Sequence, residues 1–177
     1  LNSNAYESVR VSLYPDSSEE PFDGMVVKVK VDSTNIFDQI DKVKSITDQF
    51  QGLARLRLDF NESYDLPRAI RICKMLDTMP IDYIEQPLPK NNFEDMYELR
   101  LHTEIPIAVD EMITDFDSIE KMLDHQCADV FILKPMIIGG VHKTKKMVEM
   151  IKAQDKRVSL SSLLESNVGR HMYLHMS

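Results

Sequence analysis

The chain has 177 residues, of which 43% are hydrophobic and 28% are charged, and its formal net charge is −8. This composition is typical of a globular domain with a sizeable core, and an acidic chain without a basic block argues against a nucleic-acid partner. No apolar run approaches the roughly 18 residues that a membrane span needs. The two cysteines, Cys73 and Cys127, lie far apart in helix-like context, which favours buried free thiols in the reducing cytoplasm.

Apolar runs that end in polar residues recur along the chain. Each has the β-branched and aromatic interior of a buried strand and a functional side chain or a breaker at its exit. In chain order they are residues 25–30, 56–59, 81–85, 107–110, 130–134 and 158–162. Their ends recur every 24 to 29 residues, about the length of one strand, one helix and two short loops. A weaker candidate strand spans Tyr6 to Leu13.

The segments between these runs have helical spacing. In residues 35–46, Ile36, Ile40 and Val43 recur on one face, with Phe37 beside them. Alternating strands and helices predict parallel βα units, which form either a closed barrel or an open doubly wound sheet. We favour a TIM-type barrel because polar side chains end nearly every strand, whereas an open sheet would gather them at one switch point.

The number of strands predicts an incomplete barrel. A closed parallel barrel needs about eight strands, and this chain offers six clear strands and one weaker candidate. We therefore expect residues 1–177 to form one partial barrel domain without its last strand.

Two lysines open the set of candidate functional residues. Lys28 and Lys30 are two apart on a strand and point to the same face, while Val27 and Val29 point to the other. Inside a barrel the two ammonium groups repel, which favours the neutral amine of one of them and makes it a usable base. The alternative is an exposed edge strand with solvated lysines.

Carboxylates follow at the ends of the next three strands. Asp59, which shares a face with Arg57 and Asn61, is followed by Glu85 and then by Asp110. Asp59 alone could pair with Arg57 across the barrel. Three carboxylates that converge are costly without a cation, and all-oxygen ligation suits Mg²⁺ or Mn²⁺. The alternative is a separate ion pair for each acid.

Lys134 completes this constellation, four strands after Lys30 and therefore about opposite to it in a barrel. A divalent cation flanked by lysines suits proton abstraction next to the carboxylate of a small-molecule substrate. Ser161 and Ser162, after the last strand, either hydrogen-bond a substrate carboxylate or cap a loop. The pair Gly139-Gly140 favours a tight turn before a helix that begins near Val141, rather than a phosphate cradle.

Taken together, the strand ends resemble a known family. The motifs are Lys28-Val29-Lys30, Arg57-Leu58-Asp59-Phe60-Asn61, Ile84-Glu85-Gln86-Pro87, Val109-Asp110-Glu111 and Lys134-Pro135 to Gly139-Gly140. In order and spacing they resemble the muconate-lactonizing subgroup of the enolase superfamily, over about residues 25 to 170. The resemblance implies a TIM-type (β/α)7β barrel, bound Mg²⁺ and an N-terminal capping domain, for which this chain shows no counterpart.

Within this subgroup the chain most resembles the o-succinylbenzoate synthases. Arg57 before Leu58-Asp59, the run 132–135 and the run 160–169 point that way. The resemblance implies dehydration of 2-succinyl-6-hydroxy-2,4-cyclohexadiene-1-carboxylate to o-succinylbenzoate, an intermediate of menaquinone or phylloquinone synthesis. The implied roles are Lys30 as base, Lys134 as opposing cation, Asp59, Glu85 and Asp110 as Mg²⁺ ligands, and Lys28 keeping the base poised, with Arg57, Asn61, Ser161 and Ser162 lining the substrate pocket.

Two other functions stay open at this point. Racemases of N-acylamino acids and dipeptide epimerases of the subgroup use the same pair of lysines from opposite faces. The third reading is a non-catalytic barrel fragment. Phe60, where the family usually has a small residue, is a departure from the pattern.

Overall fold

The computed structural model describes residues 12–16, 20–32 and 34–162. Its strands form one parallel sheet in the order of the sequence, β1-β2-β3-β4-β5-β6-β7. The strand bounds are β1 Ser12–Leu13, β2 Val26–Lys30, β3 Arg55–Asp59, β4 Ile81–Glu85, β5 Ile107–Val109, β6 Val130–Leu133 and β7 Arg157–Leu160. Sequential order without a reversal is the topology of a barrel wall, because a doubly wound sheet reverses its order at a switch point.

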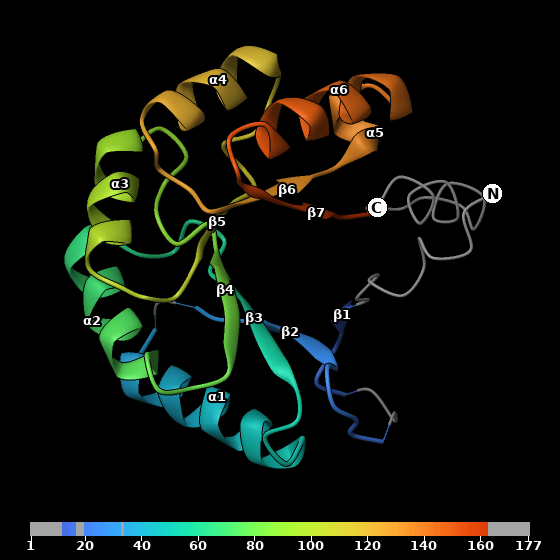
Figure 1. Cartoon of the computed structure of the whole chain (residues 1–177). Coiled ribbons are helices and arrows are strands. Elements are labelled where there is room, and N and C mark those ends of the chain that lie inside the picture. Colours follow the sequence, from blue (N-terminus) through green and yellow to red (C-terminus); the bar gives the residue numbers. More distant parts are fainter. Residues whose placement is uncertain (1–11, 17–19, 33, 163–177) are drawn as a thin grey trace.

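Helices cover one face of this sheet, which curves away from them to form part of a barrel (Figure 1). Their bounds are α1 Ile36–Gln49, α2 Leu66–Leu76, α3 Phe93–Leu101, α4 Phe116–Asp124, α5 Pro135–Ile138 and α6 Val141–Lys152. Asn35, Asp65, Asn92 and Asp115 cap the first four of them, each with a side-chain oxygen that accepts a backbone N–H of the first turn. The expected partial TIM-type barrel is confirmed.

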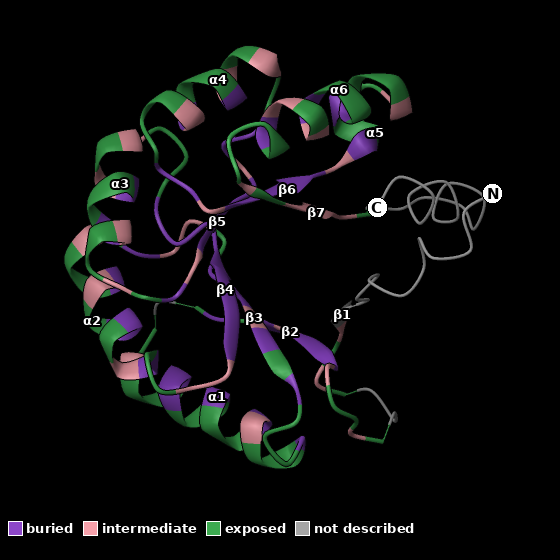
Figure 2. Ribbon diagram, viewed as in Figure 1, coloured by how far each residue is buried: buried purple, intermediate pink, exposed green. Residues whose placement is uncertain are grey.

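The core lies between the helices and the sheet. Val27, Val29, Leu56 and Leu58 are at most 1% exposed and belong to this core. Since successive strand residues point to opposite faces, the polar residues between them point to the inner face of the barrel wall. Figure 2 shows burial along the strands and on the sheet-facing sides of the helices.

The register of the parallel strands brings their carboxyl ends to one edge. Lys30 is paired with Asp59, Asp59 with Glu85, and Glu85 with Ala108. The register shifts between Leu56 and Arg57, where one more residue is used on β4. The candidate functional residues thus lie at one end of the sheet, as expected.

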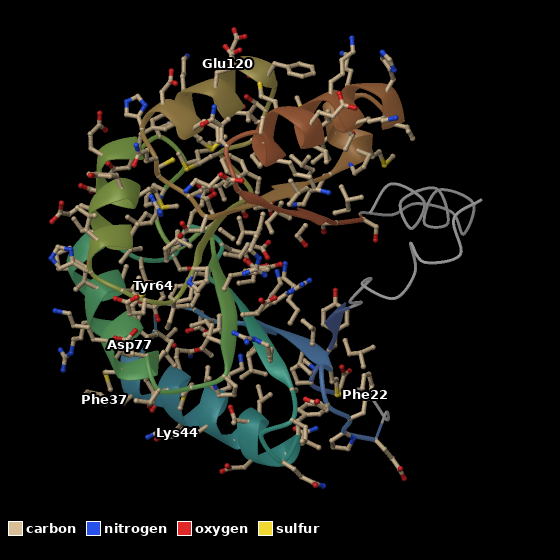
Figure 3. All side chains as sticks on the ribbon, viewed as in Figure 1. Phe22, Phe37, Lys44, Tyr64, Asp77 and Glu120 are labelled. Carbon is tan, nitrogen blue, oxygen red and sulfur yellow. The ribbon has the colours of Figure 1, made fainter. Side chains whose placement is uncertain are left out.

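The helical segments differ from expectation at two places. Phe37 is 55% exposed and points outward from α1, as Figure 3 shows, whereas Gln39 is buried beside Ile40 and Val43. The second difference is α5, a short helix that was not predicted. It ends at Ile138 and is capped by Gly139, whose φ of 98° is the left-handed conformation that glycine adopts readily. The predicted turn and the helix start at Val141 are confirmed.

Both cysteines are free and buried, as expected. Among the described residues, no helix has the length and apolar character needed to cross a membrane.

Candidate functional site

Lys28 lies at the centre of a buried ion cluster on the inner face of the sheet. Its Nζ is 2.9 Å from Asp59 Oδ2, and it donates to both carboxylate oxygens of Glu85, each at 2.9 Å. Asp59 is 3% exposed and Glu85 is 1% exposed. Burial lowers the pKa of Lys28, but the two carboxylates outweigh it and raise the pKa well above its ordinary value. The expectation that repulsion would keep one lysine neutral does not hold for Lys28, because its carboxylate partners keep it charged.

A second ion pair lies beside the first. Asp110 directly follows β5 and is 7% exposed, and its Oδ2 accepts from Lys134 Nζ at 2.5 Å. Lys134 follows β6 and stands directly before α5. The side chains of Asp59, Glu85 and Asp110 are therefore all occupied by lysine ammonium groups.

The charge of this cluster is unbalanced. Three carboxylates contact two ammonium groups, so one negative charge has no counterpart among these five side chains. Burial raises the pKa of Glu85 to about 7. The charges of Asp59 and Asp110 also raise this pKa, while Lys28 lowers it. The charge of Asp110, from the second ion pair, thus also acts on Glu85.

Lys30 belongs to a separate chain of hydrogen bonds at the same end of the sheet. Its Nζ donates to Asn61 Oδ1 at 3.1 Å, and Asn61 Nδ2 donates to Glu111 Oε1 at 3.0 Å. The other carboxylate oxygen of Glu111, Oε2, is buried without a hydrogen-bond partner. Lys30 itself is exposed. The structure thus brings Lys30 and Asn61 together, and it adds Glu111 as the residue that orients the amide.

Arg57 lies deeper along the strand and pairs with a residue that sequence reasoning missed. Its Nε donates to Asp82 Oδ2 at 2.8 Å, and Arg157 donates to Asp82 Oδ1 at 2.7 Å. The suggested pair between Arg57 and Asp59 is wrong, because Asp59 faces Lys28 instead. The two guanidinium groups hold the pKa of Asp82 below its ordinary value despite burial. The signal in the sequence that could have identified Asp82 is its position as an acid within the apolar run 81–84.

The two serines follow β7 at the carboxyl end of the sheet. Ser161 is half-buried, and its backbone N–H donates to Leu133 O at 2.9 Å, next to Lys134. Ser162 is exposed. Residues 163–169, on which part of the family resemblance rests, lie outside the described residues.

The donor set of the carboxylate cluster (Asp59, Glu85 and Asp110) fits a hard divalent cation. All its ligand atoms are carboxylate oxygens, which Mg²⁺ and Mn²⁺ prefer, and its surplus negative charge is buried. In residues 12–16, 20–32 and 34–162, no three His, Cys, Asp or Glu side chains stand close enough together to hold a metal ion. These carboxylates instead contact the ammonium groups of Lys28 and Lys134.

Comparison with known proteins identifies the family. The family model described as enolase C-terminal domain-like matches residues 20–177. The chain belongs to this family. An o-succinylbenzoate synthase from Thermobifida fusca is 29% identical over 143 residues, which cover 81% of this chain and 44% of the relative. An L-amino acid-D/L-Glu epimerase from Sulfurimonas denitrificans is 28% identical over 152 residues, 86% of this chain and 44% of the relative. The chain therefore spans less than half the length of these relatives.

Solved structures show the same fold. A muconate cycloisomerase variant superposes with a TM-score of 0.85 at 23% identity, covering 95% of this chain and 50% of that one. L-talarate dehydratase from a Polaromonas species, solved in complex with Mg and L-glucarate, has a TM-score of 0.72 at 24% identity, covering 76% of this chain and 38% of that one. The two relatives at 29% and 28% identity carry the names of different enzymes, a synthase and an epimerase.

Proposed function

We propose that this protein is a Mg²⁺-dependent lyase that acts as an o-succinylbenzoate synthase. The observation that carries the proposal is the pair Lys30 and Lys134 at strand ends on either side of the buried carboxylate cluster. The proposed reaction removes the proton alpha to the carboxylate of 2-succinyl-6-hydroxy-2,4-cyclohexadiene-1-carboxylate and expels the ring hydroxyl, so that water and o-succinylbenzoate are formed. The partner is thus a small-molecule carboxylate, and the free cysteines fit a cytoplasmic setting.

The carboxylate cluster would hold the cation. Mg²⁺, or Mn²⁺ in its place, would supply positive charge for the substrate carboxylate and for the negative charge that develops on it during proton removal. Its charge would also balance the surplus negative charge of Asp59, Glu85 and Asp110. Burial raises the pKa of Glu85 to about 7, and the charges of Asp59 and Asp110 act in the same direction.

Lys30 is the proposed base. Asn61 accepts a hydrogen bond from its Nζ, and Glu111 fixes that amide so that an oxygen faces the lysine. After taking the proton, the Lys30 ammonium can return it to the departing hydroxide. Lys134 lies on the other side of the cluster as a cation near the substrate.

The remaining residues divide into two groups. Lys28 contacts two of the carboxylates and holds them in place, and Asn61, Ser161 and Ser162 line the substrate side of the site. Arg57, which donates to Asp82 deeper in the sheet, is proposed to line the same pocket from below.

The test is turnover of the cyclohexadiene by the protein expressed from its complete gene, followed by ultraviolet absorbance with Mg²⁺ and then with a chelator. Lys30→Ala is expected to lower kcat by about 10²–10⁴-fold, the usual contribution of a general base. Lys44→Ala is the matched control, because that lysine is 57% exposed on α1 and lies outside the site. Full activity of Lys30→Ala would refute the assigned base.

A second candidate is an epimerase or N-acylamino acid racemase that uses the same two lysines. The epimerase relative is almost as similar as the synthase relative, at 28% against 29% identity. Solvent deuterium entering the alpha position of an N-acylamino acid or a dipeptide would support this activity. A folded protein that binds no Mn²⁺ and turns over neither substrate would favour the third hypothesis, a non-catalytic barrel fragment.

A further inference from the structure

Gln86 is a buried glutamine between two ligands of the proposed cation site, and no step of the proposed reaction uses it. It directly follows Glu85 and has no exposed surface. Its φ of 38° is a left-handed conformation that residues other than glycine adopt rarely. A buried polar side chain on strained backbone calls for a structural explanation, and such strain clusters at functional sites.

The side chain of Gln86 spans the loops after β4 and β5. Its Nε2 donates to Leu88 O at 2.8 Å, while its Oε1 accepts from the backbone N–H groups of Asp110 at 3.0 Å and Met112 at 3.4 Å. Backbone N–H groups only donate and a carbonyl only accepts, so these partners fix the orientation of the amide. The backbone of Gln86 is held as well, since its N–H donates to Ala108 O at 2.8 Å.

These bonds continue the pairing of two strands beyond the point where the backbone ladder ends. The paired register between β4 and β5 runs only from Ile84–Ile107 to Glu85–Ala108. Asp110 lies past the end of β5, in a turn. The Gln86 amide therefore ties the backbone of Asp110 to the residue that follows Glu85.

We propose that Gln86 is the positioning residue that sets the separation of Glu85 and Asp110 and thereby the cation affinity of the site. This inference rests on the proposed function, because it takes the carboxylate cluster as the ligand set. Residues that orient metal ligands typically change metal affinity about 10–100-fold when they are replaced. Gln86 acts through the backbone of Asp110 and does not itself contact the substrate.

Mn²⁺ affinity of the metal-free protein, measured by calorimetry, tests the proposal without any need for turnover. Gln86→Met keeps the length of the side chain and removes all three hydrogen bonds. It is expected to weaken Mn²⁺ binding about 10–100-fold. In an Asp110→Asn background the same replacement is expected to cause no further loss, because Gln86 acts through Asp110.

Gln39→Met is the matched control. Gln39 is 6% exposed on α1, and its amide likewise makes two hydrogen bonds, with the backbone N–H and the Oδ1 of Asp32. Gln39→Met, like Gln86→Met, removes a buried amide. Its Mn²⁺ affinity is expected to stay within about twofold of the wild-type value. Equal losses in the two variants would overturn the positioning role and leave general destabilisation as the cause.

Amide hydrogen exchange gives a second measurement on the metal-free protein. Faster exchange at Asp110 and Met112 in Gln86→Met is the expected result, and unchanged exchange there would overturn the proposal. If the methionine variant does not fold, Gln86→Glu keeps an acceptor for both N–H groups, and exchange at Asp110 is expected to stay slow.

The failure of the proposed function looks different from the failure of this inference. A wild-type protein that binds no Mn²⁺ refutes the proposed cation site and with it the affinity role of Gln86. Wild-type binding that survives Gln86→Met unchanged refutes the role of Gln86 alone.

Discussion

The inner face of the sheet carries two charge clusters, each built around a buried acid, and their compositions are opposite. At the carboxyl ends of the strands, Lys28 and Lys134 face the three acids of the carboxylate cluster. Deeper in the sheet, the single acid Asp82 lies between Arg57 and Arg157. Among these described side chains, three carboxylates face two ammonium groups in the first cluster, whereas one carboxylate faces two guanidinium groups in the second.

The two central acids respond in opposite directions although both are buried. Glu85 is 1% exposed and its pKa is raised to about 7, whereas Asp82 is 5% exposed and its pKa is lowered. Burial raises the pKa of a carboxyl in both places, so the local balance of charge decides the sign. The carboxylate cluster therefore favours an additional cation, and the Asp82 cluster is already satisfied by its own arginines.

The largest expected effect is in the Asp82 cluster. Asp82→Asn removes a carboxylate that pairs with Arg57, whose side chain is only 13% exposed. Breaking a buried ion pair typically costs about 3–5 kcal/mol because it leaves an uncompensated buried charge. Urea denaturation is expected to show a loss in that range. The control is Asp41→Asn, whose side chain is 78% exposed on α1 and whose loss is expected to stay within about 0.5 kcal/mol. A loss no larger than that of the control would show that the buried pair contributes nothing to stability.

The second prediction concerns the pH dependence of stability. The pKa of Glu85 is about 7 in the folded protein against an ordinary value of 4.5, so between these pH values the folded state binds more protons than the unfolded state. Stability of the metal-free protein should therefore fall as pH rises through that window, by at most roughly 3 kcal/mol. The free energy of unfolding, measured in the presence of a chelator at pH 5 and at pH 8, checks this prediction.

Glu85→Gln is the control for this pH dependence. The amide does not titrate, so the part of the slope that Glu85 causes is expected to disappear while other groups keep theirs. A variant with the same slope as the wild type would contradict the raised pKa. Asp82 predicts the opposite behaviour, because its lowered pKa adds stability that is lost only as the solution becomes acidic.

The sequence predicted the positions of these acids better than their partners. Strand period and the recurring repeat are local patterns, and they were enough to place Asp59, Glu85 and Asp110 at one edge of a parallel sheet. The ion pairs depend on register, which the pattern does not fix. The register of β3 and β4 shifts between Leu56 and Arg57, which the sequence pattern does not predict. Arg57 is also the residue for which the sequence suggested the wrong partner.

Other differences arise from side-chain reach. We expected Lys28 to repel Lys30. Lys28 contacts two carboxylates, and Lys30 donates a hydrogen bond to Asn61. Gln86 was visible only as a spacer between an acid and a proline, since nothing local shows that its amide bridges two loops. On α1 the apolar face was predicted correctly except that Gln39 is buried and Phe37 is exposed. The hydrogen bonds of Gln39 with Asp32 make its burial possible.

The third prediction uses Mn²⁺ to separate the two clusters. A cation that binds only the folded protein stabilises it by about 2.7 kcal/mol at 100 times its dissociation constant. Thermal unfolding with Mn²⁺ is expected to show this gain in the wild type, and Asp59→Asn is expected to abolish most of it. A gain that survives Asp59→Asn would place the cation elsewhere.

The smallest expected effect comes from Arg157, whose side chain is 50% exposed, compared with 13% for Arg57. Arg157→Gln removes one of the two cations around Asp82, but solvent screens this pair and Arg57 keeps the carboxylate charged. We expect a loss of about 1 kcal/mol in urea denaturation, near the upper value for exposed ion pairs. Mn²⁺ affinity should not change, because Arg157 belongs to the cluster that needs no further cation. A large drop in Mn²⁺ affinity would show that the two clusters form a single electrostatic unit, and the contrast between them would then be wrong.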